Sequence, residues 1–142
     1  MLYCRRRVLI QLLPYLNDII ANYLNTNKNI TGECKFCRKN ISEKIDLYSL
    51  PKYLILYFGR TIGNKYISNQ INFLDEYNFE NVPYRITSVI YHSKLGKKFG
   101  HYTASCKCDN NVWYYFNDSY VTKEHFRNKS HLKPIILIYE KI

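Results

Sequence analysis

Apolar positions with a regular spacing first occur near the N-terminus. From Leu12 to Leu24 apolar side chains recur at intervals of three and four residues, which places them on one face of an α-helix. Pro14 fits the first turn of such a helix, where a missing backbone N–H costs nothing. The spacing therefore predicts a helix that begins near Pro14 and ends in the polar segment 25–29.

The rest of the chain predicts β-strands. Leu50–Phe58 is almost continuously apolar, as in a strand that is covered on both faces, and Gly59 follows it. Further strands are predicted at 66–73, 84–92, 100–108, 112–116 and 134–140. Neighbouring strands with short turns favour a largely antiparallel sheet, with the N-terminal helix packed on it or beside it, and therefore an α+β fold.

The most informative pair of strands flanks the turn at 109–111. If this turn is centred on Asp109, His101 lies opposite Asn117, close enough for an imidazole N–H to donate to the amide oxygen. A register shifted by one residue would place Asp118 there instead. Either side chain would orient the ring, and an oriented imidazole is two-thirds of a Cys-His-Asn or Cys-His-Asp catalytic unit. Such a pair also occurs as a purely structural contact at strand ends.

The composition restricts the class of protein. A chain of 142 residues corresponds to about one domain. Its hydrophobic share of 46% excludes an intrinsically disordered or linker-like protein. The net charge of +10 would allow binding to nucleic acid, but the basic residues are scattered except at Arg5–Arg7. Nucleic acid is therefore not the expected partner, and a basic nucleic-acid-binding β domain remains as an alternative of another class.

The cysteines and the N-terminus bear on the compartment. Five cysteines, an odd number that includes a Cys-x-x-Cys pair at Cys34 and Cys37, favour a reducing environment over a disulfide framework. Arg5–Arg7 and the apolar residues after them imitate a signal peptide, but Gln11 and Pro14 interrupt the apolar run. We expect an intracellular protein, cytoplasmic or nuclear or both, with no membrane partner, since no apolar stretch is long enough to span a bilayer.

Two segments, Gly100–Ala104 and Trp113–Val121, together resemble the histidine box of the ubiquitin-specific proteases, a family of deubiquitinating thiol enzymes. Other segments are similar to the family in the same order: residues 50–56 to the strand after the finger, 84–92 to the strand before the active-site loop, 92–99 to that loop and 134–140 to the closing strand. The resemblance implies the C-terminal antiparallel β-sheet half of a papain-like cysteine protease fold.

The resemblance also implies a division of the chain. Residues 1–142 would form a partial catalytic domain, with a helical lead-in at 1–31, a finger remnant at 32–48 and a palm-like sheet with the histidine box at 49–142. In this interpretation ubiquitin or ubiquitinated proteins are the partners.

Residue by residue, the resemblance assigns roles within the histidine box. His101 matches the general base, Asn117 the third member of the triad and Asp118 the acid that assists in many members. Gly100 and Tyr102 match substrate-binding positions, and Gly100 would let the substrate backbone come close because it lacks a Cβ.

The remaining cysteines give an incomplete metal site. Cys34 and Cys37 resemble the second half of the family's finger zinc site, but a tetrahedral zinc needs four ligands and there is no second Cys-x-x-Cys. We therefore expect a half site or vestigial site for a structural zinc, and no cofactor is required for catalysis. Cys106 and Cys108 share one strand face and are expected in the core.

The family's nucleophile, a cysteine in an Asn-x-Cys segment that opens a helix, has no match in this sequence. Cys4 stands directly before Arg5–Arg7 and is a poor candidate. The sequence therefore predicts a thiol-dependent deubiquitinase, which hydrolyses the bond at the ubiquitin C-terminus, with its nucleophile on an upstream segment or a second chain. A catalytically inactive ubiquitin-binding remnant is the alternative.

Overall fold

The computed structural model describes residues 8–9, 16–25, 28–43, 49–62, 65–95, 99–126 and 133–142. Cys4, Arg5–Arg7, Pro14 and the middle of the loop at 92–99 lie outside these residues. The elements before residue 70 are β1 (Val8–Leu9), α1 (Leu16–Asn25), β2 (Lys28–Glu33), β3 (Asn40–Glu43), β4 (Tyr53–Gly59), β5 (Thr61–Ile62) and β6 (Lys65–Tyr66). The later ones are β7 (Glu76–Phe79), β8 (Val82–Leu95), β9 (Phe99–Lys107), β10 (Trp113–Asn117), β11 (Tyr120–Glu124) and β12 (Pro134–Lys141).

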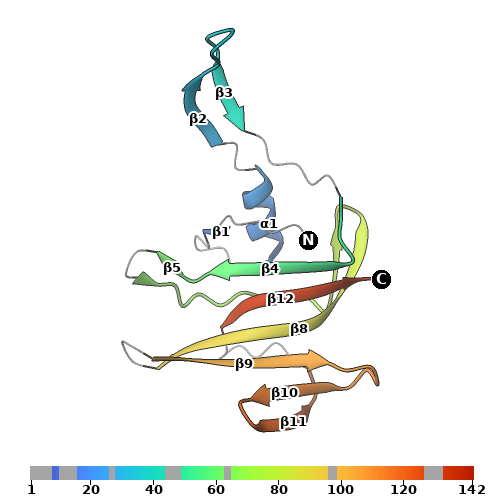
Figure 1. The fold of residues 1–142 in the computed structure, drawn as a ribbon. Helices are drawn as coiled ribbons and strands as arrows, with labels where there is room; N and C mark the ends of the chain where they lie inside the picture. The colour runs from blue at the N-terminus through green and yellow to red at the C-terminus, as the bar shows by residue number, and fades with distance from the viewer. Residues whose placement is uncertain are drawn as a thin grey trace.

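One sheet of eight strands dominates the fold (Figure 1). Its strand order is β1, β4, β12, β8, β9, β10, β11, and β7 pairs with β8 outside this path. Every pair in this sheet is antiparallel except β1 with β4. The largely antiparallel sheet predicted from the sequence is therefore confirmed.

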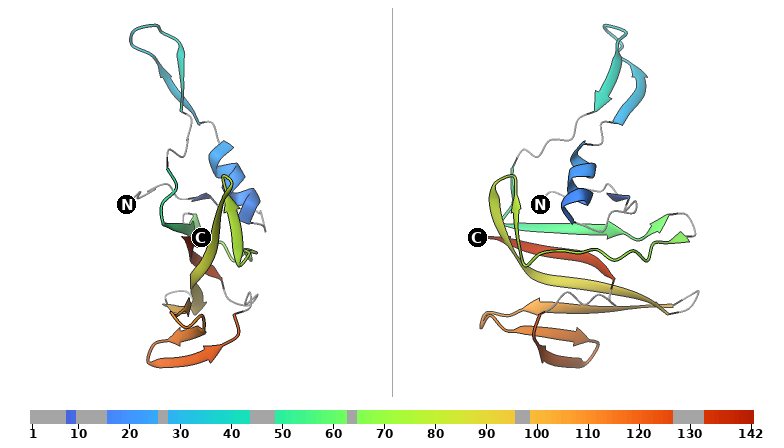
Figure 2. Two further views of the ribbon diagram at one scale, coloured as in Figure 1. Left: turned by 90° about the vertical axis from the view of Figure 1, so that its right-hand side faces the viewer. Right: turned by 180° about the vertical axis from the view of Figure 1, so that it is seen from behind.

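Helix α1 packs beside one face of this sheet (Figure 2). Leu16 and Ile19 are both 3% exposed and belong to the core, whereas Asp18 is exposed. The backbone N–H of Leu16 donates to the carbonyl of Asn72 at 3.1 Å, which fixes the start of the described helix. The predicted helix is confirmed from Leu16 onward. Within the described residues no helix has the length and apolar character needed to cross a membrane.

The core includes two residues of α1, and three tyrosines are among its largest fully buried side chains. Its buried members are Leu16, Ile19, Phe58, Ile71, Phe73, Phe79, Tyr84, Ile86, Val89, Tyr91, Leu137 and Tyr139. The hydroxyl of Tyr84 donates to the carbonyl of Pro51 at 2.5 Å, and that of Tyr139 to the carbonyl of Leu74 at 2.8 Å. Tyr84 and Tyr139 thus each contribute an apolar ring and satisfy the hydroxyl at the edge of the core.

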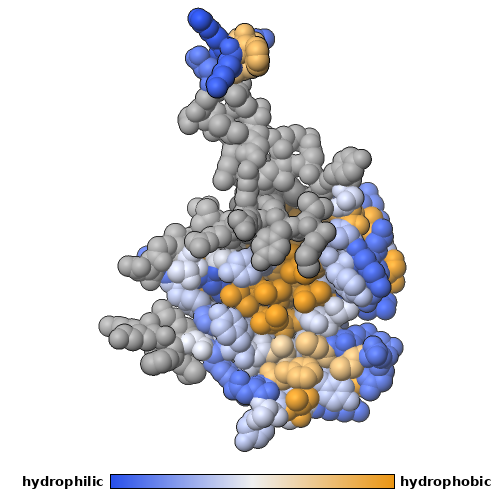
Figure 3. Space-filling view, in the orientation of Figure 1, coloured by the Kyte–Doolittle hydropathy of each residue, from blue (hydrophilic) through white to orange (hydrophobic). Residues whose placement is uncertain are grey.

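Strand β4 is not covered on both faces, contrary to the prediction from its apolar sequence. Tyr53, Ile55 and Tyr57 are 49%, 58% and 52% exposed, while Phe58 is buried in the core. Figure 3 shows apolar side chains gathered over β4 and β12. Among the described residues, the second face of this strand has no covering layer.

The segment 66–73 is not a strand beyond Tyr66, the last residue of β6. Two of its carbonyls bind a side chain instead of a neighbouring strand: Arg60 Nη1 donates to the carbonyls of Ile67 (3.2 Å) and Asn69 (2.7 Å). Apart from Tyr66 and an isolated β-bridge at Asn72, the weak alternation of this segment therefore does not correspond to strand pairing.

The β2–β3 hairpin projects away from the sheet (Figure 1). Its turn is closed by two backbone hydrogen bonds, from Cys34 N to Lys39 O (2.9 Å) and from Arg38 N to Cys34 O (2.8 Å). Cys34 and Cys37 therefore sit at the tip of the hairpin, within the segment predicted as the finger remnant.

Candidate functional site

The register of the β9–β10 hairpin differs from the predicted one. Phe116 pairs with Ala104, so the ladder continues to Asn117 opposite Thr103 and not opposite His101. The difference is two residues along the strand. Because the side-chain period of a strand is two, this shift leaves His101 and Asn117 on the same face of the sheet.

His101 and Asn117 meet diagonally across the two strands. The distance between His101 Nε2 and Asn117 Oδ1 is 2.6 Å, and both residues are half-buried. An amide oxygen only accepts hydrogen bonds, so Nε2 carries the proton of the neutral ring. The other nitrogen, Nδ1, then has a lone pair and is the atom that can accept a proton.

Asp118 lies at the β10–β11 turn. It has a φ of 51°, a left-handed conformation that Asp tolerates better than most residues, and its side chain is exposed. Among the interactions of the described residues, none joins this carboxylate to His101. The geometry thus gives Asp118 a place in the turn, and its assisting role stays a prediction.

The space beside Gly100 is filled by a side chain of the protein itself. A Cβ at Gly100 would lie 2.3 Å from Nε2 of His92, too close for any real contact. The ring of Tyr102 lies against the same imidazole, with ring centroids 4.6 Å apart, while Tyr102 is still 58% exposed. Gly100 therefore has a packing reason in this fold, and Tyr102 has accessible surface for a substrate.

The described cysteines are free thiols. Hydrogen bonds from the backbone of Cys37 and then Phe36, followed by one from the Cys37 side chain, lower the pKa of the Cys34 thiol. This favours the thiolate, which is the form that binds metal. Among the described residues, no group of three or more His, Cys, Asp or Glu side chains could hold a metal ion.

Cys106 and Cys108 do not form the predicted core pair. Cys106 is half-buried on β9, whereas Cys108 follows the end of that strand and is exposed. Cys106 is five positions from His101 along one regular strand, so the two side chains point to opposite faces. Within the part of the chain that the structure describes, no thiol is placed to transfer a proton to His101.

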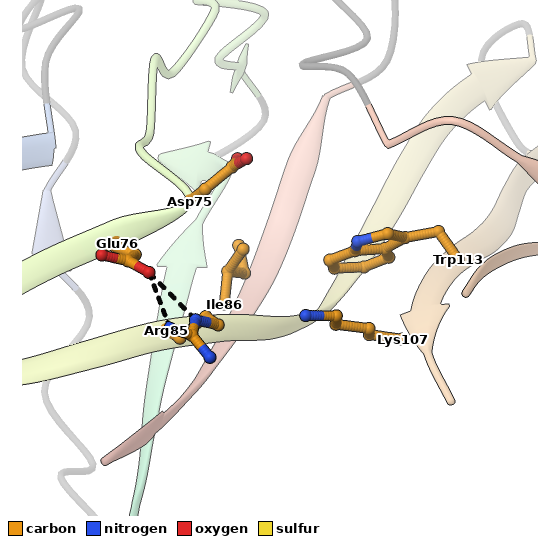
Figure 4. A pocket seen from close by; sticks show the side chains of 6 residues that line it. All are labelled: Asp75, Glu76, Arg85, Ile86, Lys107 and Trp113. Carbon is orange, nitrogen blue, oxygen red and sulfur yellow. Dashed lines mark hydrogen bonds and ion pairs between the residues drawn. The ribbon is translucent and has the colours of Figure 1, made fainter. Parts of the chain in front are cut away.

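A shallow pocket of about 170 Å³ lies at the far end of β9 from His101 (Figure 4). Asp75, Glu76, Arg85, Ile86, Lys107 and Trp113 line it. Glu76 accepts hydrogen bonds from Nε and Nη2 of Arg85 at 3.0 and 2.9 Å, so the central charges already compensate one another. This pocket is separate from the His101–Asn117 pair.

His92 lies against Gly100 and Tyr102 of the histidine box, although the sequence pattern does not single it out. One signal does point to such a neighbour: a glycine within a strand, here Gly100, often marks the close approach of another group. The identity of that group depends on the pairing of β8 with β9, which brings His92 opposite Tyr102.

The model of the family "Ubiquitin carboxyl-terminal hydrolase" matches residues 16–139. Among curated proteins, "Probable ubiquitin carboxyl-terminal hydrolase 16" of Schizosaccharomyces pombe is 26% identical, covering 89% of this chain and 31% of that protein. "Ubiquitin carboxyl-terminal hydrolase 9" of Arabidopsis thaliana is 29% identical over 77% of this chain and 14% of its own length. The chain thus spans less than a third of the length of these two relatives.

Two solved structures are similar in fold. A SAGA DUB module bound to monoubiquitin contains a chain with a TM-score of 0.78 and 20% identity, and the match covers 94% of the present chain and 34% of that one. An essential yeast splicing factor gives a TM-score of 0.60 and 21% identity, with 68% of the present chain and 26% of the other covered. These identities establish a shared fold and nothing finer.

Proposed function

The chain belongs to the ubiquitin carboxyl-terminal hydrolase family, and on that premise we propose that it supplies the general base and the orienting amide of a thiol-dependent deubiquitinase. The observation that carries the proposal is the 2.6 Å contact between His101 Nε2 and Asn117 Oδ1. It holds the ring in the tautomer that leaves Nδ1 free to accept a proton from a thiol. The nucleophilic cysteine would come from an upstream segment or from a second chain.

In the proposed reaction the thiol proton passes to Nδ1 of His101, and the thiolate attacks the carbonyl carbon of the glycine at the ubiquitin C-terminus. The imidazolium then returns its proton to the amine as the C–N bond breaks. Water hydrolyses the resulting thioester, with His101 again acting as the base. Asn117 keeps the ring oriented through both steps.

Tyr102 follows His101 in the chain and is 58% exposed, with its side chain on the opposite face of β9, and it is proposed as a substrate contact together with the backbone at Gly100. Asp118 is proposed to assist by fixing the turn that ends the strand carrying Asn117. We assign the palm-like role to residues 49–142, the finger to 32–48 and the lead-in to 1–31.

We propose no cofactor for the catalytic step and a structural role for metal at the fingertip. Cys34 and Cys37 would supply two of the four ligands of a tetrahedral zinc, and hydrogen bonds to Cys34 lower its pKa and favour its thiolate. Two further ligands would have to come from outside the described residues. Free thiols at these positions and at Cys106 and Cys108 support a reducing compartment, in the cytoplasm or nucleus.

A second candidate function is ubiquitin binding without catalysis. It is kept because, within the part of the chain that the structure describes, no thiol is placed beside His101. The two functions differ in one respect only: whether a reactive cysteine stands at Nδ1 of His101.

The test uses ubiquitin that carries a fluorogenic leaving group and ubiquitin that carries a C-terminal electrophile. Both probes are offered to this chain and, where the reading frame continues upstream of Met1, to the longer protein. Turnover and a covalent adduct, mapped by mass spectrometry to one cysteine, are expected from the form that contains the nucleophile. His101→Ala should lower kcat/KM by about 10²–10⁴-fold. Saturable binding of ubiquitin by every form, with no turnover and no adduct, would establish the non-catalytic function instead.

A further inference from the structure

We propose that His92 is a positioning residue: its ring, packed into the space that Gly100 leaves open, sets the position of the strand that carries His101. The inference rests on the proposed function of His101 as a base, but the geometry that supports it is separate from the His101–Asn117 contact. The contacts that support it join His92 on β8 to Tyr66 on β6 and to Tyr102 on β9.

The first observation is the fit between His92 and Gly100. A Cβ on Gly100 would meet Nε2 of His92 at 2.3 Å and two ring carbons of the same imidazole at 3.2 and 3.3 Å. The imidazole therefore occupies the volume in which any other residue would place its side chain. Gly100 directly precedes His101, so a displacement of one moves the other.

The second observation is that the imidazole has little room to swing away. Tyr102 lies against it at a centroid distance of 4.6 Å and an interplanar angle of 32°. Tyr66 meets it edge-on, at 5.7 Å and 63°, and the Tyr66 hydroxyl donates to the backbone carbonyl of His92 at 3.3 Å. A methyl group at Gly100 would thus have to displace β9 or break this aromatic stack.

The third observation is that the backbone of His92 is anchored on both sides. Its N–H donates to the carbonyl of Lys133 at 2.9 Å, just before β12. On the other side it pairs with Tyr102, and the next residue, Ser93, pairs with His101. The imidazole therefore transmits the position of the central strands to residues 100–102 of β9.

A Cβ at Gly100 reaches an ordinary contact of at least 3.4 Å with the imidazole only if the separation of 2.3 Å grows by about 1 Å. Hydrogen bonds weaken steeply beyond a donor–acceptor distance of about 3.2 Å, and an increase of about 1 Å would take the Nε2–Oδ1 distance of 2.6 Å past that limit. Loss of that bond lets the neutral ring populate the Nδ1–H tautomer, in which Nδ1 no longer accepts a proton from a thiol. His92 would thus act on the base without touching substrate.

The test measures the tautomer of His101 in this chain by ¹⁵N NMR of the imidazoles, at a pH where neutral rings dominate. Wild type is expected in the Nε2–H form. Gly100→Ala and His92→Ala should each lower the ratio of Nε2–H to Nδ1–H about five- to tenfold, the equivalent of one ordinary hydrogen bond. The double variant should recover part of the ratio relative to Gly100→Ala alone, because the vacated ring volume accepts the methyl group.

Two further variants keep the result interpretable. His125→Ala removes an exposed histidine that follows β11 and should leave the ratio unchanged. His92→Phe keeps the ring and should keep the wild-type ratio even if His92→Ala does not fold. The inference is overturned if Gly100→Ala leaves the ratio at its wild-type value or if the double variant shows no recovery. It is also overturned if His92→Phe lowers the ratio to the value of the unfolded chain.

Because this readout needs no turnover, it separates two failures. An intact pattern of tautomer ratios in a protein that never reacts with ubiquitin probes would refute the proposed catalysis and leave the positioning by His92 standing. Turnover with ratios that ignore His92 and Gly100 would refute the positioning alone.

Discussion

Replacing Arg60 by methionine should lower the free energy of unfolding by about 2–4 kcal/mol. The residue is 2% exposed. Its Nε donates to the carbonyl of Pro134 at 2.8 Å, and its Nη1 donates to the carbonyls of Ile67 (3.2 Å) and Asn69 (2.7 Å). One guanidinium therefore joins the start of β12 to the segment that follows Tyr66.

The magnitude follows from what each carbonyl does once the guanidinium is gone. The contact with Pro134 is buried, so this oxygen stays unsatisfied, at a cost of about 1–3 kcal/mol. The other two carbonyls are only partly buried and can bind water, which limits their loss to about 0.5–1.5 kcal/mol each. Relief of the buried charge, whose desolvation lowers the pKa of Arg60, offsets part of the sum.

The assay is urea unfolding, followed through the fluorescence of Trp113, the single tryptophan of the chain. With a urea dependence of about 2 kcal/mol per molar, Arg60→Met should lower the midpoint by about 1–2 M. Arg85→Met is the matched control: it removes an arginine that also donates twice, to Glu76, but at the surface, where an ion pair contributes about 0–1 kcal/mol. Equal shifts for the two variants would refute the assignment of Arg60 as a buried clamp.

Three further predictions concern other groups. Burial raises the pKa of Tyr91 to about 12. The unfolded chain ionises first, so the free energy of unfolding should fall between pH 10 and 12, by up to about 3 kcal/mol. Tyr91→Phe should flatten this fall in urea titrations at successive pH values, and an unchanged slope would contradict the assignment. Asn117→Ala should reduce kcat/KM of the nucleophile-containing form about tenfold, and full activity would show that the amide does not orient the base. Because the pKa of the Cys34 thiol is lowered, alkylation of Cys34 should slow less than alkylation of Cys108 when the pH falls from about 8.5 to 6.5. Mass spectrometry measures both rates, and an equal slowing at the two cysteines would contradict the prediction.

The sequence predicts best those strands that their own apolar pattern or their flanking turn residues identify, without reference to the rest of the fold. The strand predicted at 134–140 is confirmed as β12 and the one at 84–92 as part of β8. Strand β7 is not predicted, because its hairpin turns through Glu80 and Asn81 with φ of 47° and 64°, and Glu is not a usual residue for such a conformation. The segment 66–73 fails for a tertiary reason, since the side chain of Arg60 takes two of its carbonyls.

The open face of β4 shows a different limit. A run of apolar residues indicates that a strand can be buried on both faces, but it does not say by what. Here Leu54 and Leu56 pack against the core, while Ile55 remains 58% exposed on the other face. Which layer is present is a property of the rest of the fold, and periodicity within one strand carries no information about it.

The pairing of His101 with Asn117 survives an error in the register because of the parity of strands. The predicted turn was one residue too early, which moves the partner of each residue by two positions and turns a direct pair into a diagonal one. An error of half a residue in the turn centre would have shifted the register by one position and moved Asn117 to the opposite face, away from the imidazole. The contact at 2.6 Å therefore depends less on the exact turn than on an even offset between the two strands, a condition that any shift of the register by a single residue would break.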